Sequence, residues 1–213
     1  THNATYVLLN NGDLYMTGQA GGNSAGTGSS LIITSYTYMF VGPILKEVAN
    51  FELSNYGILA LLTSGIAKIC GLMQNGFGLA VAVGINPSWQ EVYIGGDRVY
   101  NIKAIFGNAS SYVGNFGILT TDGKVYLAGG NNANSNCLGA IPIASIVFGV
   151  SEVIMSEPIE DIFFCNWSTI SGGGVTYLKG ASGRIFGCGS VYGTLTNYGG
   201  DQYDFTDMKL PYV

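Results

Sequence analysis

Histidine and charged side chains are scarce in this sequence of 213 residues. It has one histidine, His2, and only 10% of its residues are Asp, Glu, Lys or Arg. With a single candidate base, and no nucleophile signature around any Ser or Cys, the sequence offers no Ser-His-Asp or Cys-His arrangement. A mobile terminal histidine is the simpler interpretation of His2. We therefore expect no catalytic residues and a protein that is not an enzyme.

Basic residues are also few: 8 Lys and Arg stand against 13 Asp and Glu, which gives a net charge of −5. Phosphate recognition needs a clustered Lys and Arg surface, and here these residues are scattered. The sequence thus argues against a nucleic-acid partner. It also has no P-loop and no glycine-rich fingerprint ahead of a helix, so a nucleotide cofactor has no support.

Metal-binding patterns are missing as well. No CxxC pair, and hence no zinc signature, occurs among the four cysteines, Cys70, Cys137, Cys165 and Cys188. Cys70 and Cys188 occupy the same position in two repeats, and we interpret them as buried small side chains rather than as a disulfide. The glycine and terminal glutamate of an EF-hand loop are absent around three aspartates, Asp201, Asp204 and Asp207. The prediction is no metal and no cofactor.

A membrane span is not expected either. The most apolar segment runs from Tyr56 to Ile85, but Lys68, Gln74 and Asn75 interrupt it. Its glycines, among them Gly65, Gly71, Gly76 and Gly78, suit strands and turns better. No stretch shows apolar residues at a sustained helical spacing. The nearest is Leu45–Leu53, and the repeat register assigns it to a strand. These features favour an all-β protein.

Four copies of one short pattern are present: a turn dipeptide ending in Gly, with a second Gly six residues later. They read NNGDLYMTG, TSGIAKICG, TDGKVYLAG and ASGRIFGCG. Their first glycines, separated by 53, 58 and 60 residues, are Gly12, Gly65, Gly123 and Gly183. A period of this size indicates a repeat architecture built from one supersecondary unit.

Each copy predicts a β-hairpin. Apolar runs flank the turn dipeptides, and such dipeptides favour type I′ turns, which need positive φ at both central residues. The strands are apolar on both faces, which is typical of strands covered on both sides. A radial stack of small sheets, a β-propeller, provides that cover. We expect positive φ at the four glycines and an antiparallel hairpin around each.

The repeat resembles that of the regulator-of-chromosome-condensation family. The segment ILTTDGKVYLAGGNN (118–132) is the best match to the family pattern, an apolar strand, LT-x-DG-x-VY-x-x-G and an Asn/Gly-rich loop. An upstream element also recurs, as NIKAIFGNASS, PIEDIFFCNWS and ILKEVANFELS. The resemblance covers nearly the whole chain and implies a propeller fold, on a scaffold that serves nucleotide exchange, photoreception, ubiquitin ligation and secreted inhibition.

We therefore predict one β-propeller domain, 1–213, with repeat units at about 1–44, 45–98, 99–157 and 158–213. Placing Val213 before Thr1 gives KLPYVTHNATYVLLNNG, which aligns without a gap with VANFELSNYGILALLTSG. Pairing of Lys209–Val213 with Ala4–Leu9 would close the ring within one blade. Two hypotheses follow: a four-bladed propeller closed by its chain ends, which we favour, or part of a larger ring, since the family usually has seven blades.

The functional prediction is a non-catalytic recognition or structural module. Loops rich in Asn, Gly, Ser and Tyr on an acidic scaffold are typical of extracellular recognition surfaces and of virion proteins of the tail-fibre or receptor-binding type. We expect an extracellular or virion location and a protein or glycan partner, in a homo-oligomer or larger assembly. The alternative is an intracellular regulatory propeller that docks a GTPase-like protein. A third class, a glycan-processing enzyme, would need a carboxylate pair spaced for glycoside hydrolysis.

The candidate binding residues lie in the loops that follow the repeat motif, because binding residues concentrate on loops held by a rigid scaffold. These loops are Gln19–Ser30, Leu72–Gly78, Gly130–Gly139 and Ser190–Asp201. Aromatic and amide side chains give them adaptable contacts. The predicted binding residues are Phe77, Asn132, Asn134, Tyr192 and Tyr198.

Overall fold

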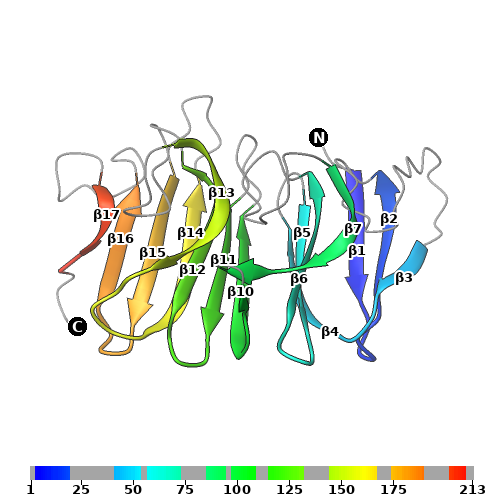
Figure 1. The fold of residues 1–213 in the computed structure, drawn as a ribbon, viewed down its shortest axis with the longest axis horizontal. Coiled ribbons are helices and arrows are strands. Elements are labelled where there is room, and N and C mark those ends of the chain that lie inside the picture. Colours follow the sequence, from blue (N-terminus) through cyan, green and yellow to red (C-terminus); the bar gives the residue numbers. More distant parts are fainter. Residues whose placement is uncertain are drawn as a thin grey trace.

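The computed structural model consists of strands and connecting turns (Figure 1). It describes residues 3–19, 41–53, 57–72, 85–94, 97–108, 115–131, 144–166, 174–189 and 202–209. These ranges contain no helix, and hence none that is long and apolar enough to cross a membrane. The prediction of an all-β chain is confirmed.

Within the described residues, four antiparallel sheets of three or four strands follow one another along the chain. The first has three strands, β1 (Asn3–Leu8), β2 (Leu14–Gln19) and β3 (Val41–Leu45). The second has β4 (Val48–Leu53), β5 (Gly57–Leu62), β6 (Ala67–Leu72) and β7 (Ile85–Glu91). The third has β10 (Ile102–Asn108), β11 (Asn115–Thr120), β12 (Val125–Asn131) and β13 (Ala144–Val153). The fourth has β14 (Ile159–Asn166), β15 (Gly174–Gly180), β16 (Ile185–Gly189) and β17 (Gln202–Asp207). A small hairpin, β8 (Tyr93–Ile94) and β9 (Asp97–Arg98), lies between the second and third sheets in sequence.

The sheets follow one another across the molecule, with β1–β3 at one end and β14–β17 at the other (Figure 1). Neighbouring sheets pack face to face, so β5 and β11 are buried along their whole length. Apolar clusters fill the three spaces between the sheets, centred on Leu14 and Ile58, on Leu59 and Ile105, and on Leu119 and Leu178. This is the packing of propeller blades, and the predicted propeller fold is confirmed.

Closure by the chain ends is not seen among the described residues. There, β1 pairs with β2 and β17 pairs with β16, and the two sheets lie at opposite ends of the molecule. Residues 210–213, four of the five expected to pair with the Ala4–Leu9 segment, lie outside the described ranges. The division into four repeat units and one domain also stays a prediction.

The hairpin turns differ in type from the prediction. The four glycines have φ between 78° and 84°, as expected, but no positive φ occurs at the residue before any of them. In the first turn, the Gly12 N–H donates to Leu9 O (2.9 Å) and the Leu9 N–H donates to Asp13 O (3.0 Å). The same pair of bonds recurs in the other three turns. These are three-residue loops, a type I turn followed by a glycine bulge, so positive φ is needed at the glycine alone.

Short connectors join consecutive sheets and hold their turns together. The Val48 N–H donates to Gly12 O (2.9 Å), and the Ile159 N–H donates to Gly123 O (2.9 Å), so each of these connectors bonds back to the preceding turn. Each connector also accepts a bond from the following turn. These bonds run from Thr63 N to Glu47 O (2.7 Å), from Thr121 N to Asn101 O (2.8 Å) and from Ala181 N to Pro158 O (2.9 Å). The turns of the four sheets therefore form one continuous edge, here called the turn face.

Candidate functional site

The binding residues predicted from the sequence lie outside the described residues. All five belong to segments after β6, β12 and β16, which begin at the sheet edge away from the turn face. The role of Phe77, Asn132, Asn134, Tyr192 and Tyr198 stays a prediction. Within the described residues, a candidate site lies on the turn face.

Exposed large hydrophobic side chains mark one such surface. Among the described residues, three of the five lie around the β8–β9 hairpin: Tyr93 is 43% exposed, Tyr100 62% and Ile154 82%. Tyr93 begins β8, Tyr100 follows β9, and Ile154 directly follows β13, which lies beside β8. We call these three residues, with Arg98, the hairpin surface. Exposed apolar groups gathered in this way are typical of protein interaction sites.

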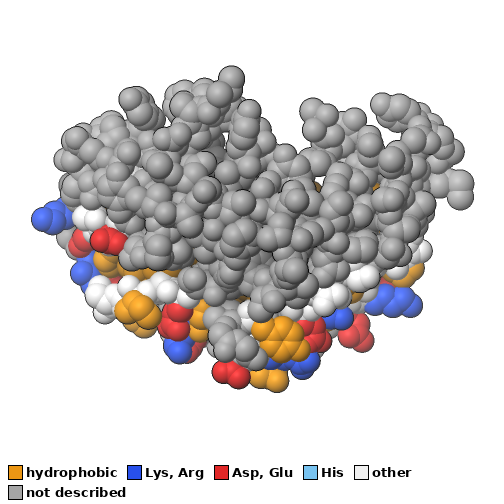
Figure 2. All heavy atoms as spheres, turned by 45° about the horizontal axis from the view of Figure 1, so that its top comes forward, with side chains coloured by type: hydrophobic (Ala, Val, Ile, Leu, Met, Phe, Trp, Pro, Cys, Tyr) orange, Lys and Arg blue, Asp and Glu red, His pale blue; other side chains and the backbone are white. Residues whose placement is uncertain are grey.

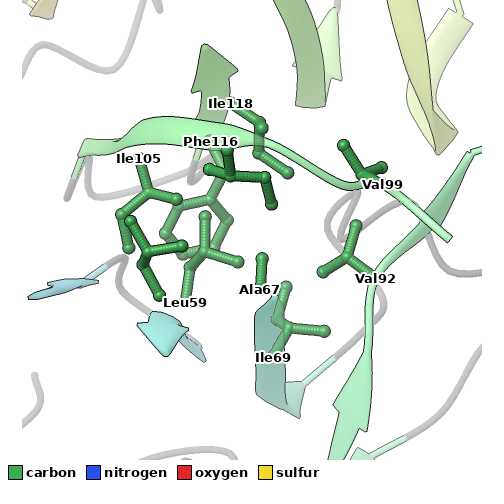
Figure 3. Close-up of a cluster of buried hydrophobic side chains, with 10 residues drawn as sticks. Leu59, Ala67, Ile69, Val92, Val99, Ile105, Phe116 and Ile118 are labelled. Carbon is green, nitrogen blue, oxygen red and sulfur yellow. The ribbon is translucent and has the colours of Figure 1, made fainter. Parts of the chain in front are cut away.

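The hairpin is held rigidly by two valines at its base. Val92 and Val99 are 4% and 8% exposed and point into the cluster between the second and third sheets, beside Ile69 and Ile118 (Figure 3). Tyr93 and Tyr100 directly follow them in sequence. Because successive residues of an extended chain point to opposite sides, burial of the valines turns both tyrosines outward.

The segment from Val92 to Asn101, here called the insertion, carries the β8–β9 hairpin. Backbone hydrogen bonds fix its position on the turn face. The Val92 N–H donates to Ala67 O (3.0 Å), next to the turn of the second sheet. At its other end, Asn101 accepts a bond from Thr121 in the turn of the third sheet. Asn101 adopts φ 59°, a left-handed conformation that asparagine tolerates better than most residues. The insertion is thus tied to two neighbouring blades.

Polar contacts orient the exposed side chains. Arg98 forms an ion pair with Glu91, and the Tyr93 hydroxyl donates to Glu91 Oε2 at 3.3 Å. A hydrogen bond to Tyr93, with the nearby Glu91 charge, raises the pKa of Arg98 above its ordinary value. The guanidinium is therefore a fixed cation beside two exposed aromatic rings. In Figure 2, the coloured lower edge of the molecule carries charged side chains of both signs among hydrophobic ones.

The cavity described beside the base of the hairpin is too small for a ligand. This cavity, between the second and third sheets, measures about 10 Å³ and has an apolar lining that includes Leu59, Phe116 and Tyr126. Ligand pockets are roughly 300–1,000 Å³, so this cavity has room for one water molecule at most. Burial raises the pKa of Tyr126 above its ordinary value, so the phenol stays neutral. No group of three His, Cys, Asp or Glu side chains suited to a metal ion occurs in the described ranges.

The cysteines behave as the sequence indicates where they are described. Cys70 and Cys188 are fully buried thiols in different sheets. Burial raises the pKa of Cys70 far above its ordinary value, which keeps the thiol protonated. The interpretation as small buried side chains is confirmed for both residues.

The hairpin surface was not predicted from the sequence, although a signal is present. Gly95-Gly96 stands between EVYI and DRVY, which is a turn dipeptide between two short β-prone runs. It falls outside the register of the four repeats, so the repeat pattern conceals it. Only the coordinates show that the valines enter the core while the tyrosines remain outside.

Comparison with known proteins agrees on the fold. No protein-family model and no curated protein sequence matches the chain. Solved structures do match, at 15% identity. Human WBSCR16 matches over 98% of this chain and 51% of its own, with a TM-score of 0.68. Yeast RCC1 (Prp20) bound to Kap60 matches over 97% and 47%, with a TM-score of 0.73. Prp20p from Saccharomyces cerevisiae, described with its binding to Gsp1p and histones, matches over 97% and 48%, with a TM-score of 0.72.

These matches define the fold as an RCC1-type β-propeller. The resemblance seen in the repeats is confirmed at the level of the fold, and the chain spans about half the length of the solved structures it matches. The expected extracellular or virion location is wrong. Its basis was loop composition alone, whereas the RCC1 structures that share the fold over nearly the whole chain are those of intracellular regulators, described with Kap60, Gsp1p and histones.

Proposed function

We propose that this chain is a non-catalytic regulatory module that docks a GTPase-like protein partner at the hairpin surface. The observation that carries the proposal is the β8–β9 insertion itself. Its base is buried in the core, while Tyr93, Tyr100 and Ile154 remain exposed on the turn face. A rigid element that presents apolar side chains to solvent is suited to binding another macromolecule.

The chemistry of the surface favours a protein over a small ligand. Tyrosine and arginine are the residue types, with tryptophan, that dominate the binding energy of protein interfaces. Here Arg98 is already held by Glu91 and Tyr93, so little side-chain entropy is lost when a partner covers it. Exposed side chains of Tyr93, Tyr100 and Ile154 around an arginine suit a protein face better than a glycan or a cofactor.

The likeness to Prp20p supports the class of partner. That protein is described with its binding to Gsp1p, a GTPase, and to histones, and it shares this fold over nearly all of the present chain. The scaffold is therefore compatible with docking a GTPase on one face. The docking residues proposed here are taken from this chain and not transferred from Prp20p, because the two proteins share only 15% identity.

The test is a binding titration against a panel of purified GTPases from the source cell, each in its GDP-loaded, GTP-loaded and nucleotide-free forms. We expect at least one to bind, and replacement of both Tyr93 and Tyr100 with Ala to weaken that binding by about tenfold or more, because central interface tyrosines typically contribute over 1 kcal/mol each. Both rings are exposed, so the thermal midpoint should change little.

Phe163→Ala is the matched control, since Phe163 is an equally exposed aromatic residue (47%) on the fourth sheet, away from the hairpin. It should leave the affinity unchanged. Binding that survives the double substitution, or that Phe163→Ala weakens equally, would exclude the hairpin surface. Binding that instead depends on Tyr192 and Tyr198 would favour the loops proposed from the sequence.

A further inference from the structure

Between the second and third sheets, a carboxylate occupies a position that the next sheet gives to phenylalanine. Glu52 and Phe106 are each the fifth residue of the first strand of their sheet, β4 and β10. The pairing register agrees, because Glu52 lies opposite Leu59 on β5 and Phe106 lies opposite Gly117 on β11. Phe106 packs into the apolar cluster between the third and fourth sheets. Packing at this position therefore requires no charge, and the presence of Glu52 needs another reason.

Gly107 gives the Glu52 carboxylate a fixed place. A Cβ at Gly107 would lie 2.8 Å from Glu52 Cβ and 3.0 Å from Leu53 O, so the lack of a side chain lets β4 and β10 approach this closely. At this contact, the Gly107 N–H donates a hydrogen bond to the Glu52 carboxylate. A carboxylate can accept about four such bonds, so among the described residues most of its acceptor capacity is not used.

Apolar groups surround the Glu52 carboxylate on the described strands. Leu59, opposite Glu52, packs with Ile105 and Phe116 (Figure 3). This burial raises the pKa of Glu52 above its ordinary value, although the bond from Gly107 lowers it. Neighbouring strands β5 and β11 carry no charged side chain, and the one on β10, Lys103, donates at 3.2 Å to Glu160 O in the fourth sheet. A partly buried carboxylate without a cation beside it costs stability.

The eight Lys and Arg of the sequence do not balance this charge. All eight lie in the described ranges, and the ion pairs that they form there go to other carboxylates, namely Glu91, Glu157, Glu160 and Asp207. The segments that leave the second and third sheets at the end away from the turn face contain no Lys or Arg in their sequence: 54–56, 73–84, 109–114 and 132–143. The cation that Glu52 lacks is therefore not supplied by these residues.

A second acceptor with unused capacity occurs at the same end of the third sheet. Asn115 opens β11 beside the last residue of β10 and is 1% exposed, and among the described residues nothing donates to its Oδ1. Buried acceptors of this kind are uncommon, because they cost free energy. The neighbouring Phe116 packs towards the second sheet, so Asn115 points to the opposite face, away from Glu52. Both faces of the third sheet thus carry an acceptor for a donor-rich partner, at the end away from the turn face.

We propose that Glu52 binds an arginine side chain of a protein partner. The guanidinium is more weakly hydrated than an ammonium group and pairs with carboxylates in partly buried sites. Its charge offsets the cost of the isolated carboxylate, so binding of the cation and ionisation of Glu52 favour each other. The site lies at the end of the sheets away from the turn face, so it is separate from the hairpin surface and does not depend on the partner proposed there.

An NMR titration of the isotope-labelled chain with N-acetyl-arginine amide at pH 7 tests the site with a defined probe. We expect saturable shifts of the Glu52 Cδ and Gly107 amide resonances. N-acetyl-citrulline amide has nearly the same shape without the charge and should shift neither. Glu52→Gln should abolish the Gly107 shift, whereas Asp204→Asn, at an exposed carboxylate of the fourth sheet, should leave it unchanged.

Three results of this titration overturn the proposal. The arginine amide could leave both resonances unmoved, or move them no more than the citrulline amide does. Calcium chloride alone could saturate the same shifts at a lower concentration, which would assign the site to a metal ion instead.

Thermal unfolding gives an independent test, because the ionised carboxylate should cost the free chain stability. With the folded pKa of Glu52 raised, this loss is present at pH 7 and disappears as the pH falls through the folded pKa towards 4.5. Glu52→Gln keeps an acceptor for the Gly107 N–H and removes the charge. We expect it to raise the thermal midpoint at pH 7, by an amount that vanishes near pH 4.5. A midpoint that is unchanged or lower at pH 7 would mean that the carboxylate serves the fold, and would refute the proposal.

Discussion

Four glycines in the same turn position differ in their surroundings. Gly65 and Gly123 have nearly the same φ, 78° and 81°. A Cβ at Gly123 would lie 2.5 Å from Pro158 Cβ, on the connector that bonds to this turn, whereas a Cβ at Gly65 would meet nothing within 4 Å. Gly65 is therefore required for its backbone conformation alone, and Gly123 also for close packing between two sheets.

Alanine at these two positions separates the two requirements. Gly65→Ala should cost about 1–2 kcal/mol of unfolding free energy, the strain of a left-handed residue with a Cβ. Gly123→Ala carries the same strain and also displaces the connector, so we expect a further loss of about 1–3 kcal/mol. Urea unfolding of the two variants measures the difference. Equal losses would contradict the packing role of Gly123.

A second residue-scale feature is the carboxylate of Glu157. It lies on the connector before β14 and accepts three hydrogen bonds at 2.9 Å, from Ser182 N, Ser182 Oγ and Arg184 Nε. The bond from the Ser182 hydroxyl, with the others and the Arg184 charge, holds the pKa of Glu157 below its ordinary value of 4.5. Arg184 also lies over the Phe186 ring, 5.3 Å from its centroid. The carboxylate therefore ties the connector to the last hairpin.

Glu157→Gln should lower stability most at neutral pH. A carboxylate with a lowered folded pKa stabilises the native state above its unfolded pKa, and this contribution is lost as the pH falls through the folded pKa. The gap in thermal midpoint between wild type and variant should thus narrow as the pH falls below 4.5. Glu152→Gln, at an exposed carboxylate, should show a much smaller gap. A constant gap across pH for Glu157→Gln would refute the assignment.

At the scale of the elements, the sequence predicts the hairpins that recur in the four repeats. It does not predict the β8–β9 hairpin, which occurs once. The hairpins, their glycines and the strand at 48–53 follow from the spacing of the four motifs. The turn type does not, because a Gly-containing dipeptide fits both a two-residue and a three-residue loop. The β8–β9 hairpin interrupts the repeat once, so no second copy reveals it, and only packing separates its buried valines from its exposed tyrosines.

Exchange of this hairpin for a short loop tests its independence from the fold. Replacing residues 93–98 with a Gly-Ser linker leaves Val92 and Val99 in the chain to fill the core. We expect circular dichroism and the urea midpoint to stay close to wild type, while binding of the protein partner is lost. A chain that no longer unfolds cooperatively would mean that the hairpin is part of the fold rather than a docking element.

At the scale of the whole molecule, four sheets form a row with two unlike ends. Closure of the ring by pairing of the two termini stays a prediction, because residues 210–213 lie outside the described residues. The location was mispredicted because loop composition indicates adaptable contacts and does not indicate the compartment in which a protein is found.

The central claim is that a protein partner docks on the turn face through the hairpin surface. Hydrogen exchange of the chain, alone and saturated with a GTPase that binds it, tests this most directly. The account predicts added protection at residues 92–101 and 152–156, with little change at 19–30, 72–78, 130–139 and 190–201. Protection confined to those four loops, or absent from residues 92–101, would contradict it.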